Sequence, residues 1–263
     1  MDNEKVVRLV YLLGSDSTGE FDAPPGVTNT LDDAIPRLQL AGRIIQSLTA
    51  ELIAEKGFPR KTFRLLRGAD RLPIVDTPVS SLSVAQLRKL GEMELWSHFS
   101  DLLQNLPNRD NIIDVAIIAD SHYDPDIQSL TPLAHTALGG FPLALYGSAS
   151  IHSWPTKVGL IESRFSDQTL TEPFLFAEIG RSNQYWANVT TSMGAVMHEL
   201  GHAFGLPHPD PSEPPNIMNR GFDYLNRMIV TFEPGHGAID PDVDVMPRWC
   251  DSNVAILQNS PWL

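Results

Sequence analysis

The sequence predicts an α/β (α+β) protein built on a mixed, twisted sheet with one antiparallel edge strand. Three observations indicate this class. Apolar strand segments alternate with amphipathic helices over residues 6–118, a later helix carries a cluster of histidines, and the segment after that helix is rich in proline and glycine. Such alternation is typical of a parallel sheet covered by helices. We expect residues 1–263 to form a single domain, with an upper half over about 1–205 and a loop-rich lower half over about 206–263.

The first predicted elements are a strand, a helix and a second strand. The apolar run Val6–Gly14 is typical of a buried strand. A helix follows, because apolar residues then recur at the spacing of one helical face. These residues are Leu38, Ala41, Ile45, Leu48 and Leu52. Pro36 suits the first turn of this helix and Gly57 its C-terminal end. Thr62–Arg67 is predicted as the second strand.

A second helix and a third strand complete this half of the chain. Ser83 and Gln86 have the spacing of a capping box, in which each side chain bonds the backbone N–H of the other, so the helix is expected to begin there. Pro107 ends it, and the strongly apolar run Asn111–Ile118 is the third strand. The order β-α-β-α-β therefore predicts parallel strands joined by helical crossovers.

The next predicted strands lie closer to the histidine cluster. Gly139–Gly147 is predicted as a fourth strand. It is expected at an edge of the sheet, because Pro142 lacks the N–H that a central strand donates. Phe174–Ile179 is predicted as a further short strand.

Two helices are predicted in the last third of the chain. One is capped by Thr190 or Thr191 and ends near Phe204, and a final helix covers Asp251–Asn259. The intervening segment, as far as Pro247, is rich in proline, glycine, aspartate and asparagine, so we expect it to be mostly loop.

The helix that ends near Phe204 carries the residues with the clearest chemistry. His198 and His202 are four residues apart, which places both imidazoles on one helical face, one turn apart. Gly205 lets the chain turn sharply, because glycine adopts positive φ without steric cost, and His208 then returns as a third ligand. Three neutral nitrogens leave the fourth position of a zinc ion open for water. The sequence therefore predicts one catalytic zinc ion as cofactor.

Glu199 lies next to the first histidine and points to the neighbouring flank of the helix. From there a carboxylate reaches a zinc-bound water but not the metal. Zinc lowers the pKa of such a water from about 15.7 towards 7, and Glu199 as general base can pass its proton to the leaving amine. This predicts peptide-bond hydrolysis. The alternatives are a zinc hydrolase of another amide substrate and a non-catalytic metal-binding protein, although the latter has no need of a base beside its ligands.

The stretch from His198 to His208 resembles, at every fixed position, the HExxHxxGxxH signature of the metzincin metalloproteases. Metzincins also have a Met-turn beneath the zinc ion, and the resemblance assigns Met218, in Asn216-Ile217-Met218-Asn219, to that turn. The resemblance implies an endopeptidase, a hydrolase whose edge strand pairs with an extended peptide. The residues implied for this strand are Gly139, Gly140, Phe141, Leu143 and Leu145.

Residues 216–227 are also similar to an uncharacterised, largely fungal family of zinc metallopeptidases. Other features depart from known metzincins. Astacins and serralysins place a metal-binding tyrosine two residues past the turn methionine, whereas Tyr224 lies six residues past Met218. A fifth zinc ligand at Tyr224 therefore stays an open question. No cysteine precedes the motif in this sequence, which excludes a cysteine-switch segment within it.

Two other sets of residues suggest metal sites less strongly. The first is His122, Asp124, His135 and His152, and the second is Asp240, Asp242 and Asp244. The histidine set resembles the ligands of a structural zinc ion in matrix metalloproteinases, but with different spacing. The aspartates offer the oxygen ligands that calcium prefers. We favour polar, solvated loops in both places, with a second zinc ion or calcium as the minor alternative.

The distribution of charge and the length of the apolar segments argue against some classes of binding partner. Of the net charge of −13, residues 111–263 carry −11. This field disfavours nucleic acid and anionic membrane partners. The negative charge would also attract cationic substrates, although a simpler explanation is that it keeps the protein soluble. No apolar run approaches the roughly 20 residues that a membrane helix needs. We expect a monomer that acts on peptide or protein substrates.

The compartment is predicted from the start of the sequence and from cysteine usage. Met1–Lys5 shows no basic segment leading into an apolar signal core. The single cysteine, Cys250, has no partner for an internal disulfide, which fits a reducing compartment. The sequence as written therefore predicts a cytoplasmic protein, and secretion after removal of a leader is the alternative.

Overall fold

The computed structural model describes residues 4–263 except 107–108, 127–128, 131–136, 179 and 211. Its centre is a five-stranded sheet in the order β2-β1-β3-β7-β6. β1 (Val6–Leu12), β2 (Val75–Asp76), β3 (Ile112–Ile118) and β7 (Leu143–Gly147) run parallel, while β6 (Ala137–Gly140) runs antiparallel to β7. The predicted α/β class, with a mixed sheet and one antiparallel edge strand, is confirmed.

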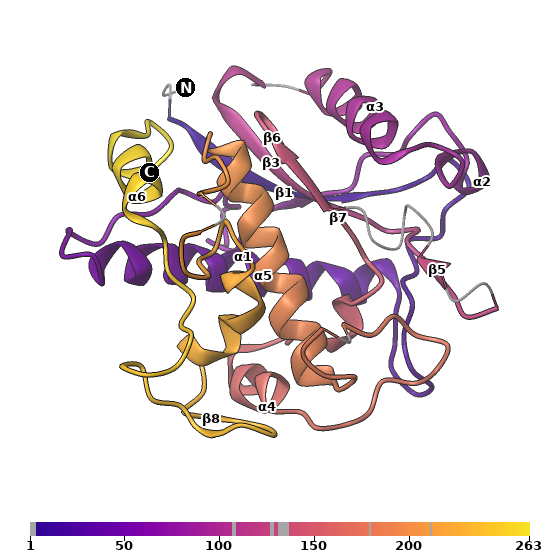
Figure 1. The fold of residues 1–263 in the computed structure, drawn as a ribbon. Helices are drawn as coiled ribbons and strands as arrows, with labels where there is room; N and C mark the ends of the chain where they lie inside the picture. Colours follow the sequence, from indigo (N-terminus) through magenta and orange to yellow (C-terminus); the bar gives the residue numbers. More distant parts are fainter. Residues whose placement is uncertain (1–3, 107–108, 127–128, 131–136, 179, 211) are drawn as a thin grey trace.

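Helices cover both faces of this sheet (Figure 1). Side chains alternate between the faces of a strand. Leu9 accordingly packs with α1 (Leu31–Ala54) and α5 (Tyr185–Ala203), whereas its neighbour Val10 packs with α3 (Glu92–Gln104). The histidine motif lies on α5, so the fold holds the motif against one face of the sheet.

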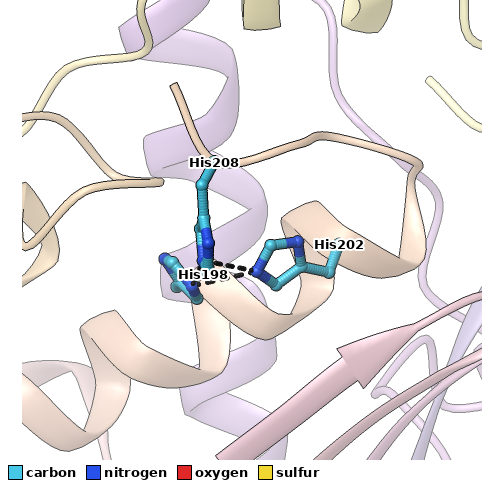
Figure 2. Close-up of side chains that lie close together, drawn as sticks. All are labelled: His198, His202 and His208. Carbon is cyan, nitrogen blue, oxygen red and sulfur yellow. Dashed lines mark hydrogen bonds between the residues drawn. The ribbon is translucent and has the colours of Figure 1, made fainter. Parts of the chain in front are cut away.

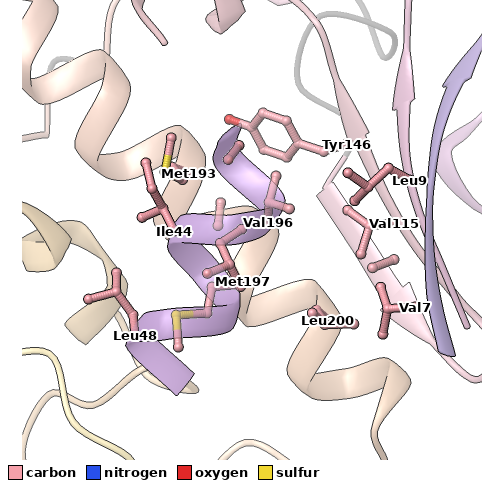
Figure 3. Close-up of a cluster of buried hydrophobic side chains, with 14 of the residues drawn as sticks. Val7, Leu9, Ile44, Leu48, Val115, Tyr146, Met193, Val196, Met197 and Leu200 are labelled. Carbon is pink, nitrogen blue, oxygen red and sulfur yellow. The ribbon is translucent and has the colours of Figure 1, made fainter. Parts of the chain in front are cut away.

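The larger apolar core fixes the orientation of α5. Figure 3 shows side chains of α1, α5 and the strands meeting between the helices and the sheet. They include Ile44, Leu48, Val7, Leu9, Val115, Tyr146, Met193, Val196, Met197 and Leu200. Burial of apolar surface stabilises such a layer by roughly 25 cal/mol per Å². Because this face of α5 is held in the core, its histidines and Glu199 are oriented along the other side of the helix.

The first helix begins earlier than predicted. The Asp33 carboxylate accepts hydrogen bonds from the Thr30 backbone N–H, at 3.0 Å, and from the Thr30 hydroxyl, at 2.6 Å. This local cap starts α1 at Leu31, so Pro36 lies inside the helix and not in its first turn. At the other end Gly57 has a φ of +82°, as expected for a residue that ends a helix.

The predicted second helix is divided in two. The capping box of Ser83 and Gln86 is confirmed, but it starts a short helix, α2 (Val84–Leu87). Gly91 then caps the longer α3. A glycine in a helix interior is destabilising, because glycine loses more conformational freedom on folding than any other residue. This explains why the predicted helix is interrupted at Gly91.

The histidine helix also begins before its predicted cap. α5 starts at Tyr185, with Gln184 as its cap residue, and both Thr190 and Thr191 are buried inside it. The Thr190 hydroxyl donates to the Trp186 carbonyl at 2.6 Å. Threonine can make this bond to the preceding turn within a helix, so its presence does not by itself mark a helix start.

Two short strands were predicted wrongly. Thr62–Arg67 forms no regular strand, because Leu65 makes only an isolated parallel bridge to Val7, and β2 takes the outer place in the sheet. Phe174–Ile179, whose last residue lies outside the described part, is a turn and irregular chain. The apolar residues of both segments pack against the rest of the fold. A sequence pattern does not distinguish such packing from strand pairing.

Gly139–Gly147 is not one strand but a hairpin. β6 and β7 pair antiparallel, with Gly140 opposite Leu143, and the chain reverses at Phe141 and Pro142 between them. Pro142 does lack a ladder N–H, as expected, but it occupies the turn instead of an edge strand. β6 alone therefore forms this edge of the sheet, and β2 forms the opposite edge.

This hairpin separates the residues predicted for the edge. Gly139 and Gly140 belong to β6. Leu143 and Leu145 belong to β7, an inner strand between β3 and β6, and both are fully buried against the core beneath α3. A leucine in that core cannot meet a substrate at the sheet edge, so the prediction of one continuous edge strand through Leu143 and Leu145 is wrong.

The last part of the chain is more ordered than predicted. It contains a 3-10 helix, η4 (Gly221–Met228), and a small pair of strands, β8 (Phe232–Glu233) and β9 (Gly237–Ala238). α6 (Asp251–Asn259) has both predicted ends. The remaining short elements are η1 (Arg109–Asn111), β4 (Tyr123–Asp124), β5 (Ser129–Leu130), η2 (Ile151–Ser153), η3 (Val158–Leu160) and α4 (Ile161–Phe165).

Within the described residues, none of the helices combines the length and apolar character needed to cross a membrane.

Candidate metal centre and active site

The structure brings the three predicted histidines together. His198 and His202 project from α5, and the chain turns back at Gly205, which has a φ of +89°. His208 on the returning segment then faces both of them (Figure 2). The three Nε2 atoms lie 3.0 to 3.2 Å from one another. Among the described residues, this is the one group of three or more histidine, cysteine or acidic side chains that could hold a metal ion.

Backbone carbonyls determine which nitrogens of the cluster are free. His198 Nδ1 lies 2.7 Å from the Ile217 carbonyl oxygen and His202 Nδ1 lies 2.8 Å from that of Leu206. A carbonyl only accepts hydrogen bonds, so each Nδ1 is the donor and the Nε2 of each neutral ring presents a lone pair. Lone pairs turned towards one another at this distance repel unless a cation lies between them. Nitrogens at about 2.0–2.1 Å from a tetrahedral zinc ion would be roughly 3.3 Å apart, so the residues fit zinc.

Burial keeps these rings in the form that binds metal. His198 is 8% exposed, and burial lowers its pKa to about 4. Burial also lowers the pKa of His202, with the charge of His208 acting in the same direction. A metal ligand must be a neutral imidazole, so both shifts favour the ligand state near neutral pH.

Glu199 lies between the helix and the sheet edge. Its side chain is largely buried, and burial is the main cause that raises its pKa to about 7. A hydrogen bond from the backbone N–H of Gly139 on β6 opposes this shift, and the charge of Glu92 adds to it. The edge strand therefore contacts the one carboxylate next to the histidines in the sequence.

The contact between β6 and α5 requires glycine at one position. A Cβ atom built on Gly139 would lie 2.2 Å from the Glu199 carbonyl oxygen, well inside van der Waals contact. A Cβ on the neighbouring Gly140 would meet Trp96 at 3.6 Å, which is an ordinary contact. Only Gly139 thus permits the close approach of strand and helix.

Gly139→Ala is therefore expected to lower the free energy of unfolding by about 1–3 kcal/mol, as overpacking does, and to lower any catalytic activity by displacing Glu199. Denaturant unfolding and activity assays measure the two effects. Gly140→Ala is the matched control and should stay within about 0.5 kcal/mol of the parent chain. Equal effects of the two substitutions would contradict the close approach described here.

Met218 lies directly beneath the histidine helix. It is 1% exposed, and a Cβ atom built on Gly201 would lie 2.6 Å from its sulfur. The Met218 backbone N–H donates to the Asn216 side chain at 3.0 Å. The preceding residue, Ile217, supplies the carbonyl that holds His198. The methionine and the carbonyl that orients the His198 ring therefore belong to the same turn of the chain.

Comparison with known proteins identifies the family. A family model named Metallopep and described as "Putative peptidase family" matches residues 1–238. The chain belongs to this family. It is similar to two fungal proteins, each named "Putative zinc metalloproteinase". The one from Schizosaccharomyces pombe is 29% identical over 243 residues, covering 86% of this chain and 39% of the relative. The one from Saccharomyces cerevisiae is 27% identical over 263 residues, covering 86% and 37%.

The predicted relation to fungal zinc metallopeptidases is thus confirmed, and the chain spans less than two fifths of the length of either fungal relative. The fold is similar to that of OgpA from Akkermansia muciniphila. A catalytically inactive form in complex with an O-glycopeptide substrate has a TM-score of 0.60 at 14% identity. The wild-type protein has a TM-score of 0.58 at 16% identity. Both matches cover 100% of this chain and 62% of OgpA.

The burial of Met218 allows a prediction about its packing. Leucine is nearly isosteric with methionine, so Met218→Leu should cost less than about 1.5 kcal/mol of stability. Met218→Ala would leave a cavity and should cost about 2–5 kcal/mol. Thermal and denaturant unfolding of the two variants measure these costs, and zinc content shows whether the cavity disturbs the histidines. An alanine variant as stable as the leucine variant would contradict tight packing against Gly201.

Phe222 is a residue of the site that the sequence analysis missed. Its ring packs edge-on against the His198 ring, with centroids 5.0 Å apart. A Cβ atom on Gly194 of α5 would lie 2.2 Å from the Phe222 carbonyl oxygen. Glycine in a helix interior costs stability relative to alanine, so Gly194 was the available signal that another segment approaches α5 closely.

Tyr224 packs against two arginines. The Arg181 guanidinium carbon lies 3.9 Å and the Arg227 guanidinium carbon 4.6 Å from its ring centroid. Arg227 in turn makes a two-pronged pair with Glu233 at 2.8 and 2.9 Å. Cation–π stacking of this kind accounts for the position of Tyr224 without a metal ion.

The two weaker sets of residues do not converge on a metal site in the described chain. His122 Nδ1 pairs with Asp22 at 2.8 Å. His152 is buried beside Tyr185, and burial lowers its pKa to about 3. His135 lies outside the described residues. The aspartates of the second set bond within their own loop, where Asp244 accepts from the Asp240 N–H at 2.8 Å and pairs with His236.

Proposed function

We propose that this chain is a zinc-dependent endopeptidase, in which His198, His202 and His208 hold one zinc ion and Glu199 is the general base. One observation carries the proposal: three Nε2 atoms converge within 3.2 Å, two of them on rings held by backbone carbonyls, beside a buried carboxylate. Membership of a peptidase family supports the same activity. When bound, zinc supplies Lewis-acid chemistry, which activates water and polarises a carbonyl.

The residues of the chain have separate tasks in this reaction. Glu199 accepts a proton from the attacking water at its carboxylate and returns it to the nitrogen of the leaving amine. The Gly139 N–H bonds that carboxylate and so keeps it in place between helix and strand. Met218 packs beneath the ligand helix, which supports its assignment to a Met-turn of the metzincin type.

The sheet edge is where a substrate would bind. β6 ends one side of the described sheet, and its residue Gly139 lies against α5. An extended peptide can add to such an edge through main-chain hydrogen bonds. Phe141, at the hairpin turn, is 62% exposed and is available to contact that peptide. Because pairing along an open edge does not require a peptide terminus, this arrangement favours cleavage within a chain.

The experiment uses long peptides blocked at both ends. The protein should release internal fragments, identified by mass spectrometry. Treatment with o-phenanthroline should abolish cleavage, the non-chelating m-phenanthroline isomer should not, and added zinc should restore it. Cleavage that persists after complete removal of zinc would contradict the metal assignment. Release of terminal residues only, from unblocked peptides, would contradict the endopeptidase assignment.

A further inference from the structure

A groove of about 530 Å³ is formed by the end of the histidine helix, by α6 and by the residues that follow α6. The apolar side chains that line it are Phe204, Ile256, Pro261 and Trp262. Among the described residues that line it, none carries a charge. Such a groove removes an apolar group from water, whereas a charged group would find no partner there. This groove, defined by these four residues, is called the α6 groove below.

The α6 groove is attached to the segment that carries the histidines. Phe204 caps the C-terminal end of α5, two residues after His202. Asn253 of α6 is fully buried, and its side-chain amide donates to the carbonyl of Pro207 at 3.3 Å. Pro207 directly precedes His208. The end of α5 and α6, which both line the groove, are therefore in contact with the part of the chain that presents two of the three histidines.

The same groove also meets the hairpin that follows the edge strand. The ring centroids of Trp262 and Phe141 lie 6.0 Å apart. Phe141 comes directly after β6 and lies two residues beyond Gly139, which packs against Glu199. A peptide that pairs with β6 and continues past Phe141 therefore arrives at Trp262. The α6 groove is thus continuous with the edge at which the substrate is proposed to bind.

Trp262 is held in a fixed position. It is 8% exposed, and its backbone N–H donates to the Ser260 hydroxyl at 3.2 Å. The Lys5 ammonium lies 4.3 Å from the centroid of its ring, a cation–π contact that holds the ring. Phe141 and Ile256 remain exposed beside this ordered residue, at 62% and 37%. A preformed surface with exposed apolar groups binds a ligand without first paying for its own ordering.

The direction of pairing determines which part of a substrate reaches the α6 groove. Antiparallel pairing is slightly more stable per residue than parallel pairing, so we expect the peptide to run antiparallel to β6. Its residues before the scissile bond then lie towards the carboxyl end of β6, at Phe141. Gly139 lies level with Glu199 and Phe141 lies two residues further on. A substrate residue about three positions before the scissile bond is therefore the first that can reach Trp262.

We propose that the α6 groove is a substrate subsite that binds a large apolar side chain, such as leucine or phenylalanine, about three to five residues before the scissile bond. This inference rests on the proposed peptidase function. Contact of such a side chain with Trp262 and Ile256 removes the apolar surface of both partners from water. A carboxylate in the same place would lose its hydration without gaining a hydrogen bond or an opposite charge.

The test uses peptides that are blocked at both ends and have one cleavage site, confirmed by mass spectrometry. Leucine, serine or glutamate is placed in turn at each of the second to sixth positions before the cleaved bond. For the zinc-loaded protein, we expect kcat/KM to be at least about tenfold higher with leucine than with serine or glutamate at one or two positions in this range. The same exchange after the cleaved bond should not give this pattern.

Two pairs of variants connect the preference with the groove. Ile256→Lys should reverse the preference, so that glutamate is cleaved faster than leucine at the same position, and Ile256→Leu should retain it. Trp262→Ala should bring the ratio of leucine to serine close to one, and Trp262→Phe should keep most of it. The ratio of two substrates does not depend on the amount of folded protein, so partial unfolding of a variant cannot produce these results. Thermal unfolding and zinc content are measured in parallel.

Leu72→Lys is the matched control for Ile256→Lys. Leu72 is 43% exposed, close to the exposure of Ile256, and it lies in a bend shortly before β2 at the opposite edge of the sheet. This substitution introduces the same charge and should keep the full preference for leucine. A loss of preference in Leu72→Lys as large as that in Ile256→Lys would show that net charge, and not the groove, selects the substrate.

Three results would overturn the subsite alone. The first is an active parent protein without a preference for leucine before the cleaved bond. The second is a preference that persists unchanged in both Ile256→Lys and Trp262→Ala. The third is a parent dimer in solution that Ile256→Lys converts to a monomer, which would assign the groove to a second copy of the chain. Absence of all cleavage by the zinc-loaded parent would overturn the proposed function together with the subsite.

Discussion

Glu199→Gln is expected to leave zinc binding and the fold intact while lowering the rate of peptide hydrolysis by at least about 100-fold, the usual contribution of a general base. The glutamine amide has nearly the same shape, and its oxygen can still accept the hydrogen bond from the Gly139 N–H. It cannot accept a proton from water near neutral pH. The measurements are kcat on a fluorogenic peptide, zinc per chain and the thermal unfolding midpoint.

Glu92→Gln is the control, because it removes a negative charge that acts on Glu199 and leaves the proposed general base in place. Glu92 is exposed at the start of α3, and its charge acts on Glu199 from outside the site. We expect its replacement to leave the rate close to that of the parent chain. If Glu199→Gln kept near-normal turnover with a full zinc complement, another group would be the base and the role assigned to Glu199 would be wrong.

His202→Ala should abolish tight zinc binding and, with it, peptide hydrolysis. The purified parent chain is expected to hold about one zinc ion. Loss of the central ring would leave the Nε2 atoms of His198 and His208 without the nitrogen that lies 3.1 and 3.0 Å from them. Two nitrogens are fewer than the three protein ligands typical of a catalytic zinc site. Zinc per chain after dialysis is the direct measurement.

His236→Ala provides the comparison for this substitution. His236 is partly exposed and pairs with Asp244 in the last part of the chain, outside the histidine cluster. Its replacement should leave zinc content unchanged. In the parent chain stripped of its metal, added zinc should also raise the thermal unfolding midpoint, because a ligand that binds only the folded state stabilises it. Full zinc retention by His202→Ala would refute the ligand assignment.

The histidine cluster could be predicted from the sequence because its geometry is local. The period of one helix places His198 and His202 on one face. A single glycine with positive φ, Gly205, then brings His208 back within a few residues. The first strand, the Ser83 capping box and α6 were predicted for the same reason, since apolar spacing and capping act within a few residues.

The errors have a common physical cause. Thr190 is a good capping residue, yet it bonds the preceding turn inside α5. Leu65 is apolar as a strand residue would be, yet it makes one bridge only. Phe141 and Pro142 look like part of one strand, yet they form the turn between two. In each case the local preference allows two structures, and packing against distant segments selects between them.

By itself the sequence determined the spacing of the three histidines, the adjacent carboxylate and the alternation of strands and helices, because each depends on the local geometry of the chain. Only the tertiary structure decided the rest. It brought Gly139 against Glu199, the Ile217 carbonyl against His198, and Phe222 against Gly194. These partners come from separate segments, and their contacts exist only when the shapes of the folded elements fit, with glycines where two backbones come closest.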